Sequence, residues 1–198
     1  MLLKIGLVYL LGPAALALAS VTNAASSFLD VASAPMQELA NRTRTLVLLA
    51  VRDGGSMALV RTWRPLGVAS IWLEAGNRVP IVGSSTGQSF LAALNEPRFH
   101  ATTTCDDWAA QRSEGQRQLA QRGFTAVLGP DRFDNEMNAV SRPFNASTLG
   151  EPGVFTCGAT PDVLSEERMM SEVGPALRHA VNTLENSTGA PRAFENIG

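Results

Sequence analysis

A cluster of small hydroxyl residues, Ser84-Ser85-Thr86-Gly87, follows Pro80 and a short apolar segment. A helical pattern with Phe90, Leu91 and Leu94 begins directly after it. Hydroxyl side chains at a helix start accept hydrogen bonds from backbone N–H groups that have no acceptor within the helix. The same N–H groups, together with the helix dipole, can hold the carboxylate of a small ligand. Capping is the commoner role, so the cluster by itself leaves both functions open.

Groups that could perform catalysis or bind a metal are sparse. The two histidines, His100 in a predicted polar loop and His179 in the last predicted helix, have no further ligand at a metal-binding spacing. Cys105 and Cys157 form neither a C-x-x-C motif nor a disulfide framework, and Cys157 lies in an apolar pattern typical of a buried strand. The hydroxyl cluster lacks the G-K-[ST] ending of a phosphate loop, and no base for Ser85 is recognisable. We therefore expect no catalytic residue, no metal and no cofactor.

The overall composition is that of one folded domain with a terminal extension. The chain has 198 residues, of which 45% are hydrophobic and 17% charged. Its formal net charge of −2 argues against a nucleic-acid surface, which usually has clustered Lys and Arg. We expect a reduced, cytoplasmic protein that makes no DNA contact through this chain.

Hydrophobic periodicity predicts an α+β fold. The predicted helices span residues 13–25, 28–42, 84–94, 107–122 and 164–186. The predicted strands span residues 46–52, 56–63, 66–73, 137–144 and 153–158. Asp53-Gly54-Gly55 joins the first two strands as a hairpin, because Asp-Gly turns supply the positive φ that such loops need. Pro35 should bend or restart the second helix, while Asp106 and Gly123 should cap and end the fourth. The buried face of the last helix should carry Met170, Val173, Leu177, Val181 and Leu184.

Four motifs in order resemble the effector-binding domain of the IclR-type bacterial transcription regulators. In that family a strand is followed by G-x-R-x-P, a short pair, [ST]-x-x-G, a basic residue and an apolar helix. The corresponding segments here are Gly76-Asn77-Arg78-Val79-Pro80, Ile81-Val82, Ser84-Ser85-Thr86-Gly87 and Phe90-Leu91, with Gln88 at the basic position. The other three motifs are Pro35–Ala40 followed by Leu46–Arg52, Gln118–Phe124, and Leu164–Arg168 with Pro175–Arg178. No single motif is specific, but their order over most of the chain is.

The resemblance implies a GAF-like or profilin-like antiparallel sheet flanked by helices, preceded by a linker helix. It also implies a pocket between the sheet and the short helix, and a homodimer or homotetramer. Carried over position by position, the ligand-binding residues are Val68, Ile71, Ser84, Ser85, Thr86, Asp131, Ala139, Thr156 and Gly158. The amides of Ser85 and Thr86 would meet a ligand carboxylate, and Val68 and Ile71 would form an apolar wall.

This chain departs from the family's pocket motifs at three positions, one of which is Glu136 in place of a glycine. Ala139 stands where the family often has a cysteine, and Gly158 replaces one of two hydroxyl residues on the last strand. Fewer hydroxyl donors favour a larger or aromatic carboxylate over a small oxoacid, so the expected partner is a small organic acid or an aromatic carboxylate. The same departures would also fit a pocket that no longer binds ligand.

Residues 1–27 have two interpretations. Lys4, an apolar run and Thr22-Asn23-Ala24 resemble a signal peptide with its cleavage site. Three sequons, at residues 41–43, 145–147 and 186–188, would suit export. Tyr9–Pro13 instead resembles the end of a winged-helix wing followed by a linker helix, with Pro13 in the first turn. We favour the linker; the segment is too short and too interrupted by proline to span a bilayer.

These patterns divide the chain into a wing remnant and linker helix or signal-like segment (1–27), an effector-binding domain (28–187) and a disordered tail (188–198). The favoured function is the small-molecule effector-sensing domain of an IclR-type regulator, with DNA binding only through a winged-helix domain absent from this chain. An exported or stand-alone ligand-binding sensor is the alternative. A small enzyme using Cys157 or Ser85 is a third hypothesis, for which no partner base is visible.

Overall fold

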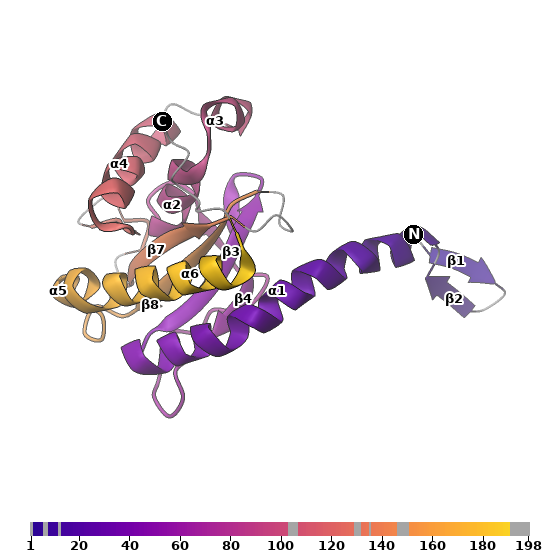
Figure 1. Ribbon diagram of the computed structural model, residues 1–198, viewed down its shortest axis with the longest axis horizontal. Coiled ribbons are helices and arrows are strands. Elements are labelled where there is room, and N and C mark those ends of the chain that lie inside the picture. The colour runs from indigo at the N-terminus through magenta and orange to yellow at the C-terminus, as the bar shows by residue number, and fades with distance from the viewer. Residues whose placement is uncertain are drawn as a thin grey trace.

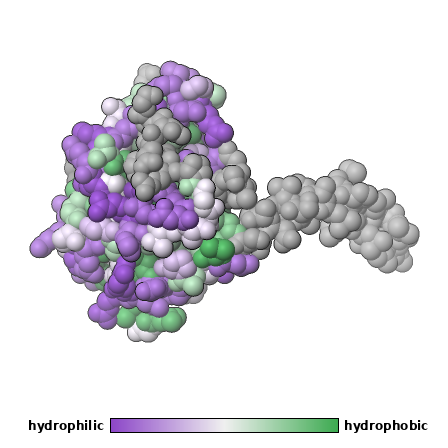
Figure 2. Space-filling model, viewed as in Figure 1, coloured by the Kyte–Doolittle hydropathy of each residue, from purple (hydrophilic) through white to green (hydrophobic). Residues whose placement is uncertain are grey.

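The computed structural model describes residues 2–5, 8–11, 13–102, 107–128, 132–134, 136–145 and 151–190, with side chains described from Phe28 onward. Among these residues, no helix is both long and apolar enough to cross a membrane. Hydrophilic residues predominate on the face shown in Figure 2, where hydrophobic residues form only small separate areas.

An antiparallel sheet of six strands, in the order β5-β4-β3-β8-β7-β6, forms the centre of the fold (Figure 1). Its strands are β3 (Leu46–Asp53), β4 (Ser56–Trp63), β5 (Arg78–Pro80), β6 (Thr125–Ala126), β7 (Asn138–Phe144) and β8 (Gly153–Ala159). A separate pair, β1 (Leu2–Ile5) and β2 (Val8–Leu11), is also antiparallel. The predicted hairpin between β3 and β4 is confirmed, with Gly54 at a φ of 62°. The α+β class is therefore confirmed.

Helices cover both faces of the sheet (Figure 1). They are α1 (Pro13–Thr43), α2 (Ser85–Ala93), α3 (Glu96–Thr102), α4 (Asp107–Arg122), α5 (Glu166–Arg168), the π-helical segment η3 (Met169–Val173) and α6 (Gly174–Thr188). One core cluster joins α1 and α6 to the sheet through residues that include Met36, Leu49, Phe155 and Val181. A second joins α2 and α4 to the opposite face, with Leu48, Phe90 and Trp108.

Alternation along the strands separates these two clusters, because successive side chains of a strand point to opposite faces. On β8, Phe155 and Cys157 belong to the α1/α6 cluster, whereas Val154 belongs to the other. Aromatic rings fill the α1/α6 side: the ring centroids of Phe28 and Phe144 are 5.0 Å apart, and those of Phe144 and Phe155 are 5.8 Å apart. The opposite face of β7 and β8 carries hydroxyl and small side chains instead, which form the candidate site.

The predicted third strand over residues 66–73 is wrong. Residues 64–77 form neither helix nor strand, and Gly67 has a φ of 72°, which lies outside the extended region. The apolar residues of this segment serve different environments. Ile71 and Leu73 pack against the α2/α4 cluster, whereas Leu66 and Trp72 are 74% and 75% exposed. The segment therefore has the apolar composition of a buried strand, but its side chains point both into the protein and into water, and its backbone forms no strand.

Two helical predictions are also corrected. The segments predicted at 13–25 and 28–42 form one helix that continues through Pro35. Pro35 removes the donor to the carbonyl of Val31, but Val31 is half-exposed, so water can take the donor's place. His100, placed in a loop by its polar neighbours, lies in α3.

The C-terminal helical region runs over residues 166–188, two residues beyond its predicted end. Its π-helical turn places Met169 rather than Met170 fully in the core, in line with Val173. At α4 the predicted end is confirmed: Gly123 has a φ of 82°, and its N–H donates to the carbonyl of Leu119. The predicted cap Asp106 and residues 191–198 of the predicted tail lie outside the described residues.

Candidate functional site

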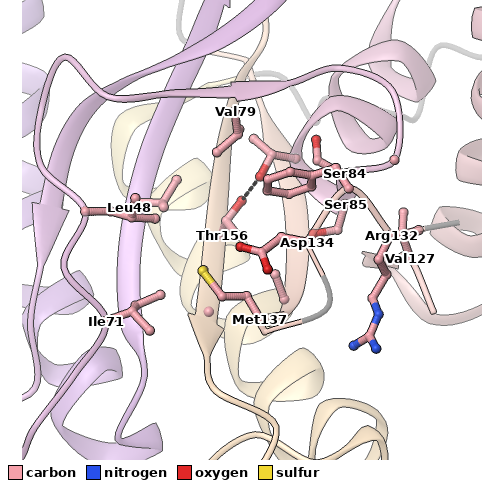
Figure 3. A pocket seen from close by; sticks show the side chains of 16 residues that line it. Leu48, Ile71, Val79, Ser84, Ser85, Val127, Arg132, Asp134, Met137 and Thr156 are labelled. Carbon is pink, nitrogen blue, oxygen red and sulfur yellow. Dashed lines mark hydrogen bonds between the residues drawn. The ribbon is translucent and has the colours of Figure 1, made fainter. Parts of the chain in front are cut away.

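A cavity lies between the first turn of α2, strands β3, β7 and β8, and the segments before β5 and β7 (Figure 3). Its lining comprises Leu48, Ile71, Leu73, Val79, Gly83, Ser84, Ser85, Thr86, Val127, Arg132, Phe133, Asp134, Met137, Ala139, Thr156 and Gly158. The cavity volume is about 40 Å³. Since one water molecule needs roughly 10–15 Å³ by this measure, the cavity has room for a few water molecules.

The start of α2 is fixed by its own cap. Ser84 is extended (φ −110°, ψ 142°), and its Oγ accepts a 2.9 Å hydrogen bond from the N–H of Gly87. The Ser84 hydroxyl also donates to the carbonyl of Pro80 at 2.5 Å. A Cβ at position 87 would lie 2.1 Å from the carbonyl oxygen of Ile81, so this turn requires glycine. The Ser84 side chain is therefore occupied in capping, while the N–H groups of Ser85 and Thr86 have no acceptor within the helix.

Five buried hydroxyls tie this turn to the sheet. Ser141 of β7 donates to the Ser85 hydroxyl at 2.9 Å and lies 2.8 Å from the Thr156 hydroxyl. Thr156 of β8 in turn lies 2.9 Å from the Thr86 hydroxyl (Figure 3). On β6, Thr125 donates to the backbone carbonyl of Ser85 at 2.9 Å. Because the hydroxyls bond one another, they hold α2 against the sheet.

The remaining walls are mostly apolar, and two positions on the strands are small. Ile71, Val79 and Met137 line the cavity, as do Ala139 and Gly158. A Cβ at position 158 would lie 3.6 Å from Ile71 Cδ1 and 3.7 Å from Met137 Cε, which is ordinary van der Waals contact. The missing side chain of Gly158 therefore contributes open volume without relieving a steric clash.

One acidic and one basic residue line the cavity, and they point in different directions. Figure 3 shows the carboxylate of Asp134 directed inward toward Thr156 and Met137, and the guanidinium of Arg132 directed away. Asp134 also accepts a 2.8 Å hydrogen bond from the N–H of Glu136, and Arg132 donates to the Asn138 side chain. A ligand in this cavity therefore meets backbone donors at α2 and a carboxylate acceptor on the opposite side.

The structure brings together most of the residues expected at the site. Ile71, Ser84, Ser85, Thr86, Ala139, Thr156 and Gly158 all line the cavity. Val68 does not: because the expected third strand is absent, it lines a separate hollow beside Arg44 and Arg168. Asp131 lies outside the described residues.

Sequence reasoning missed several lining residues. They are Leu48, Leu73, Val79, Gly83, Val127, Arg132, Phe133, Asp134 and Met137. The spacing of Ile71 and Leu73 could have indicated a shared direction for those two side chains. No local pattern indicates which acidic residue of the segment before β7 turns inward.

Cys157 is placed away from the cavity and cannot serve there as a nucleophile. Its thiol is fully buried in the α1/α6 cluster, and burial raises its pKa to about 12. A thiol in such surroundings stays protonated and unreactive at neutral pH. Cys105 lies outside the described residues. Within the described ranges, no group of three or more His, Cys, Asp or Glu residues could hold a metal ion.

A family described as "Bacterial transcriptional regulator IclR C-terminal" matches residues 24–114 of the chain. This segment includes α1 from its middle onward, the first hairpin, and the first turn of α2. No curated protein matches the sequence.

Solved structures of IclR-type regulators have the same fold. An IclR family transcriptional regulator from Brucella abortus is 24% identical, with a TM-score of 0.73 over 94% of this chain and 74% of that chain. The Thermotoga maritima IclR is 15% identical, with a TM-score of 0.67 over 91% of this chain and 76% of that one. The inducer-binding domain of a PobR double mutant from Acinetobacter, in complex with 3-hydroxybenzoic acid, is 16% identical, with a TM-score of 0.62 over 80% and 97%.

Proposed function

Since the chain carries the effector-binding domain of an IclR-type transcription regulator, we propose that the cavity beside α2 binds the effector, a small organic acid. The observation that carries the proposal is the first turn of α2. There the N–H groups of Ser85 and Thr86 lack intrahelical acceptors, and buried hydroxyls hold the turn against the sheet. A carboxylate placed at these N–H groups would also be favoured by the helix dipole.

The size and charge of the cavity narrow the class of acid. A volume of about 40 Å³ suits a short aliphatic acid, whereas an aromatic carboxylate needs the side chains of Ile71, Leu73 or Met137 to move. Asp134 would repel a second carboxylate and accept a hydrogen bond from a hydroxyl or amino group. We therefore propose a short acid with a hydrogen-bond donor at its other end.

Two substitutions at one position separate the backbone donor from the side chain. Ser85→Ala removes only the hydroxyl, whereas Ser85→Pro also removes the N–H. Proline is compatible here because it would occupy the first helical position and Ser84 before it is already extended. Lactate at a hundred times its dissociation constant should add about 2.7 kcal/mol to the free energy of unfolding.

Thermal unfolding with acetate, lactate and 3-hydroxybenzoate tests the pair of variants. Ser85→Ala should keep most of the stabilisation by lactate, and Ser85→Pro should lose it. Equal stabilisation of both variants would disprove the role of the Ser85 N–H. If none of the three acids stabilises the wild-type chain, the proposed ligand class is wrong.

We propose that the domain senses its ligand without transforming it. The Ser85 hydroxyl is engaged by Ser141, and the buried Cys157 thiol faces the other side of the sheet. Incubation with lactate should leave its NMR spectrum unchanged, whereas a new product would identify an enzyme.

We propose residues 28–187 as the ligand-binding unit of a homodimer or homotetramer in the cytoplasm, with residues 1–27 as its link to a winged-helix domain. Part of that link belongs to the same helix, α1, that packs on the sheet, which supports a mechanical connection. Deleting residues 1–25 should weaken self-association and leave the α+β core folded. Sedimentation of the full and shortened chains measures this, and an unchanged oligomer would remove the linker from the assembly. Recovery of native protein cleaved after Ala24 would favour export.

A further inference from the structure

A second and wider hollow lies where α2 and α4 pack beside β6, at the edge of the sheet. Its volume is about 660 Å³, which falls in the range of small-molecule sites. Val82, Ala110, Ala126, Val127 and Leu128 supply its apolar lining. Its polar lining comes from Gln88, Asp107, Gln111, Glu114, Arg117, Gln118 and Arg122.

One polar group in this lining is buried without a partner. Gln88 is only 4% exposed, and its carboxamide oxygen has no hydrogen-bond partner among the described residues. A buried acceptor in this state carries an uncompensated desolvation cost, which a donor group on a ligand would remove.

A cation in the same lining lacks an acidic contact. Arg122 donates to three neutral acceptors: the Gln118 side chain, the Phe124 carbonyl at 3.2 Å and the Met170 sulfur at 3.1 Å. Within the described part of the chain it forms no salt bridge, whereas Arg117 is paired with Glu114 at 2.5 Å. Burial, and then the charge of Arg117, lower the pKa of Arg122, while the charge of Glu114 acts in the opposite direction.

We propose that this hollow is a second binding site, for a small anion that also carries an N–H or O–H donor. The guanidinium of Arg122 would meet the negative group, and the Gln88 oxygen would accept from the donor. Both residues line the same hollow, so together they specify both ends of a ligand. This site does not depend on the Ser85 and Thr86 N–H groups, so it can be tested without the first cavity.

Three matched probes separate the two recognition elements: glycolate has both the charge and the donor, acetate has only the charge, and ethylene glycol has only donors. Backbone amide NMR of the Ser85→Pro variant would follow Ala110 and Ala126, which line only the second hollow. Glycolate should shift both amides, and acetate and ethylene glycol should bind about tenfold more weakly. Equal binding of glycolate and acetate, or no shift at these amides, would overturn the proposal.

Two variants then assign the contacts. Gln88→Met keeps the shape and removes the acceptor, so it should reduce glycolate binding to the level of acetate. Arg122→Gln should abolish the binding of both anions. Gln121→Met is the matched glutamine-to-methionine control: Gln121 is exposed and outside the hollow, and because it accepts a 2.8 Å hydrogen bond from Arg117, this variant also shows whether a freed Arg117 changes binding. Arg122 also ties α4 to Phe124, so if its variant unfolds, Gln88→Met decides alone. An unchanged glycolate affinity in Gln88→Met would refute the site, whatever happens in the first cavity.

Discussion

The two faces of the central sheet are made by the same strands but filled with different chemistry. Toward α1 and α6, β8 presents Phe155 and Cys157, and aromatic rings close the space completely. Toward α2, the same strand presents Thr156 and Gly158, which leave a hydroxyl network and a cavity. Alternation along a strand thus lets neighbouring residues serve stability and binding separately, and substitutions of neighbours should affect different properties.

The largest effect is expected on the apolar face. Phe155→Ala should lower the free energy of unfolding by about 3–5 kcal/mol, because it removes buried contacts and leaves a void. Urea unfolding measures the loss. Where the variant is still folded, its affinity for lactate should equal that of the wild type, and Phe133→Ala, which truncates a half-exposed ring, should cost far less. A comparable loss from both variants would contradict the division between the faces.

The adjacent residue should behave in the opposite manner. Thr156→Val keeps the side-chain shape but removes the hydroxyl partner of Thr86 and one of the two hydroxyl partners of Ser141, which still donates to Ser85, at a cost of about 1–3 kcal/mol. Since those hydroxyls position α2, lactate affinity should fall more than the modest stability loss suggests. Calorimetric titration beside urea unfolding separates the two quantities. Unchanged affinity would mean that the network has no part in positioning the binding turn.

A third substitution should change stability and binding in opposite directions. Gly158→Ala places a methyl group at ordinary contact distance from Ile71 and Met137, so it clashes with neither. Reduced freedom of the unfolded chain should raise stability by about 0.4–1 kcal/mol. The methyl group should also occupy part of the cavity and weaken lactate binding. Thermal unfolding with and without lactate tests both signs, and tighter binding would show that the cavity is larger in solution.

The smallest effect is expected at the rim of the sheet, away from both faces. Arg52 and Glu151 are joined by hydrogen bonds of 2.9 and 2.7 Å, and the bond from Arg52 lowers the pKa of Glu151. A lowered carboxyl pKa contributes stability above the ordinary value of 4.5, and this contribution disappears as the pH falls through the folded-state pKa. Because both side chains are partly exposed, Glu151→Gln should cost about 0.2–1 kcal/mol at pH 7. The free energies of unfolding of the wild type and Glu151→Gln should become equal in acid. A difference that persists there would show that the ion pair is not its source.

The sequence predicted the turns and helix ends correctly where a single residue type determines the local backbone conformation. The Asp53-Gly54 turn defined the hairpin, and Gly123 ended α4, because positive φ restricts the residue type in a readable way. The hydroxyl cluster likewise located the start of α2. Residues 66–73 failed because their apolar composition says nothing about direction: Ile71 faces the cavity and Trp72 faces water.

Site residues were predicted correctly when the helix or strand that carries them was also predicted correctly. Ser85, Thr156 and Gly158 came together because α2 and β8 were placed correctly. Val68 was wrongly assigned to the cavity because the strand predicted to carry it does not form. Asp134 could not be identified, since the segment before β7 has several acidic residues and only tertiary packing turns one inward. The second hollow was unreadable for the same reason: Gln88 and Arg122 become neighbours through the packing of α2 on α4.

The π-helical turn Met169–Val173 gives the C-terminal helix one more residue than a regular α-helix between the same end points would hold. Ser171 lies on the water-facing side of this turn. Without it, Met169 and Val173 would stand three positions apart instead of four, a spacing that still places both on one face. Deletion of Ser171 should therefore convert the turn to a regular α-helix and leave the residues after it facing the same core, which the free energy of unfolding of that variant would test.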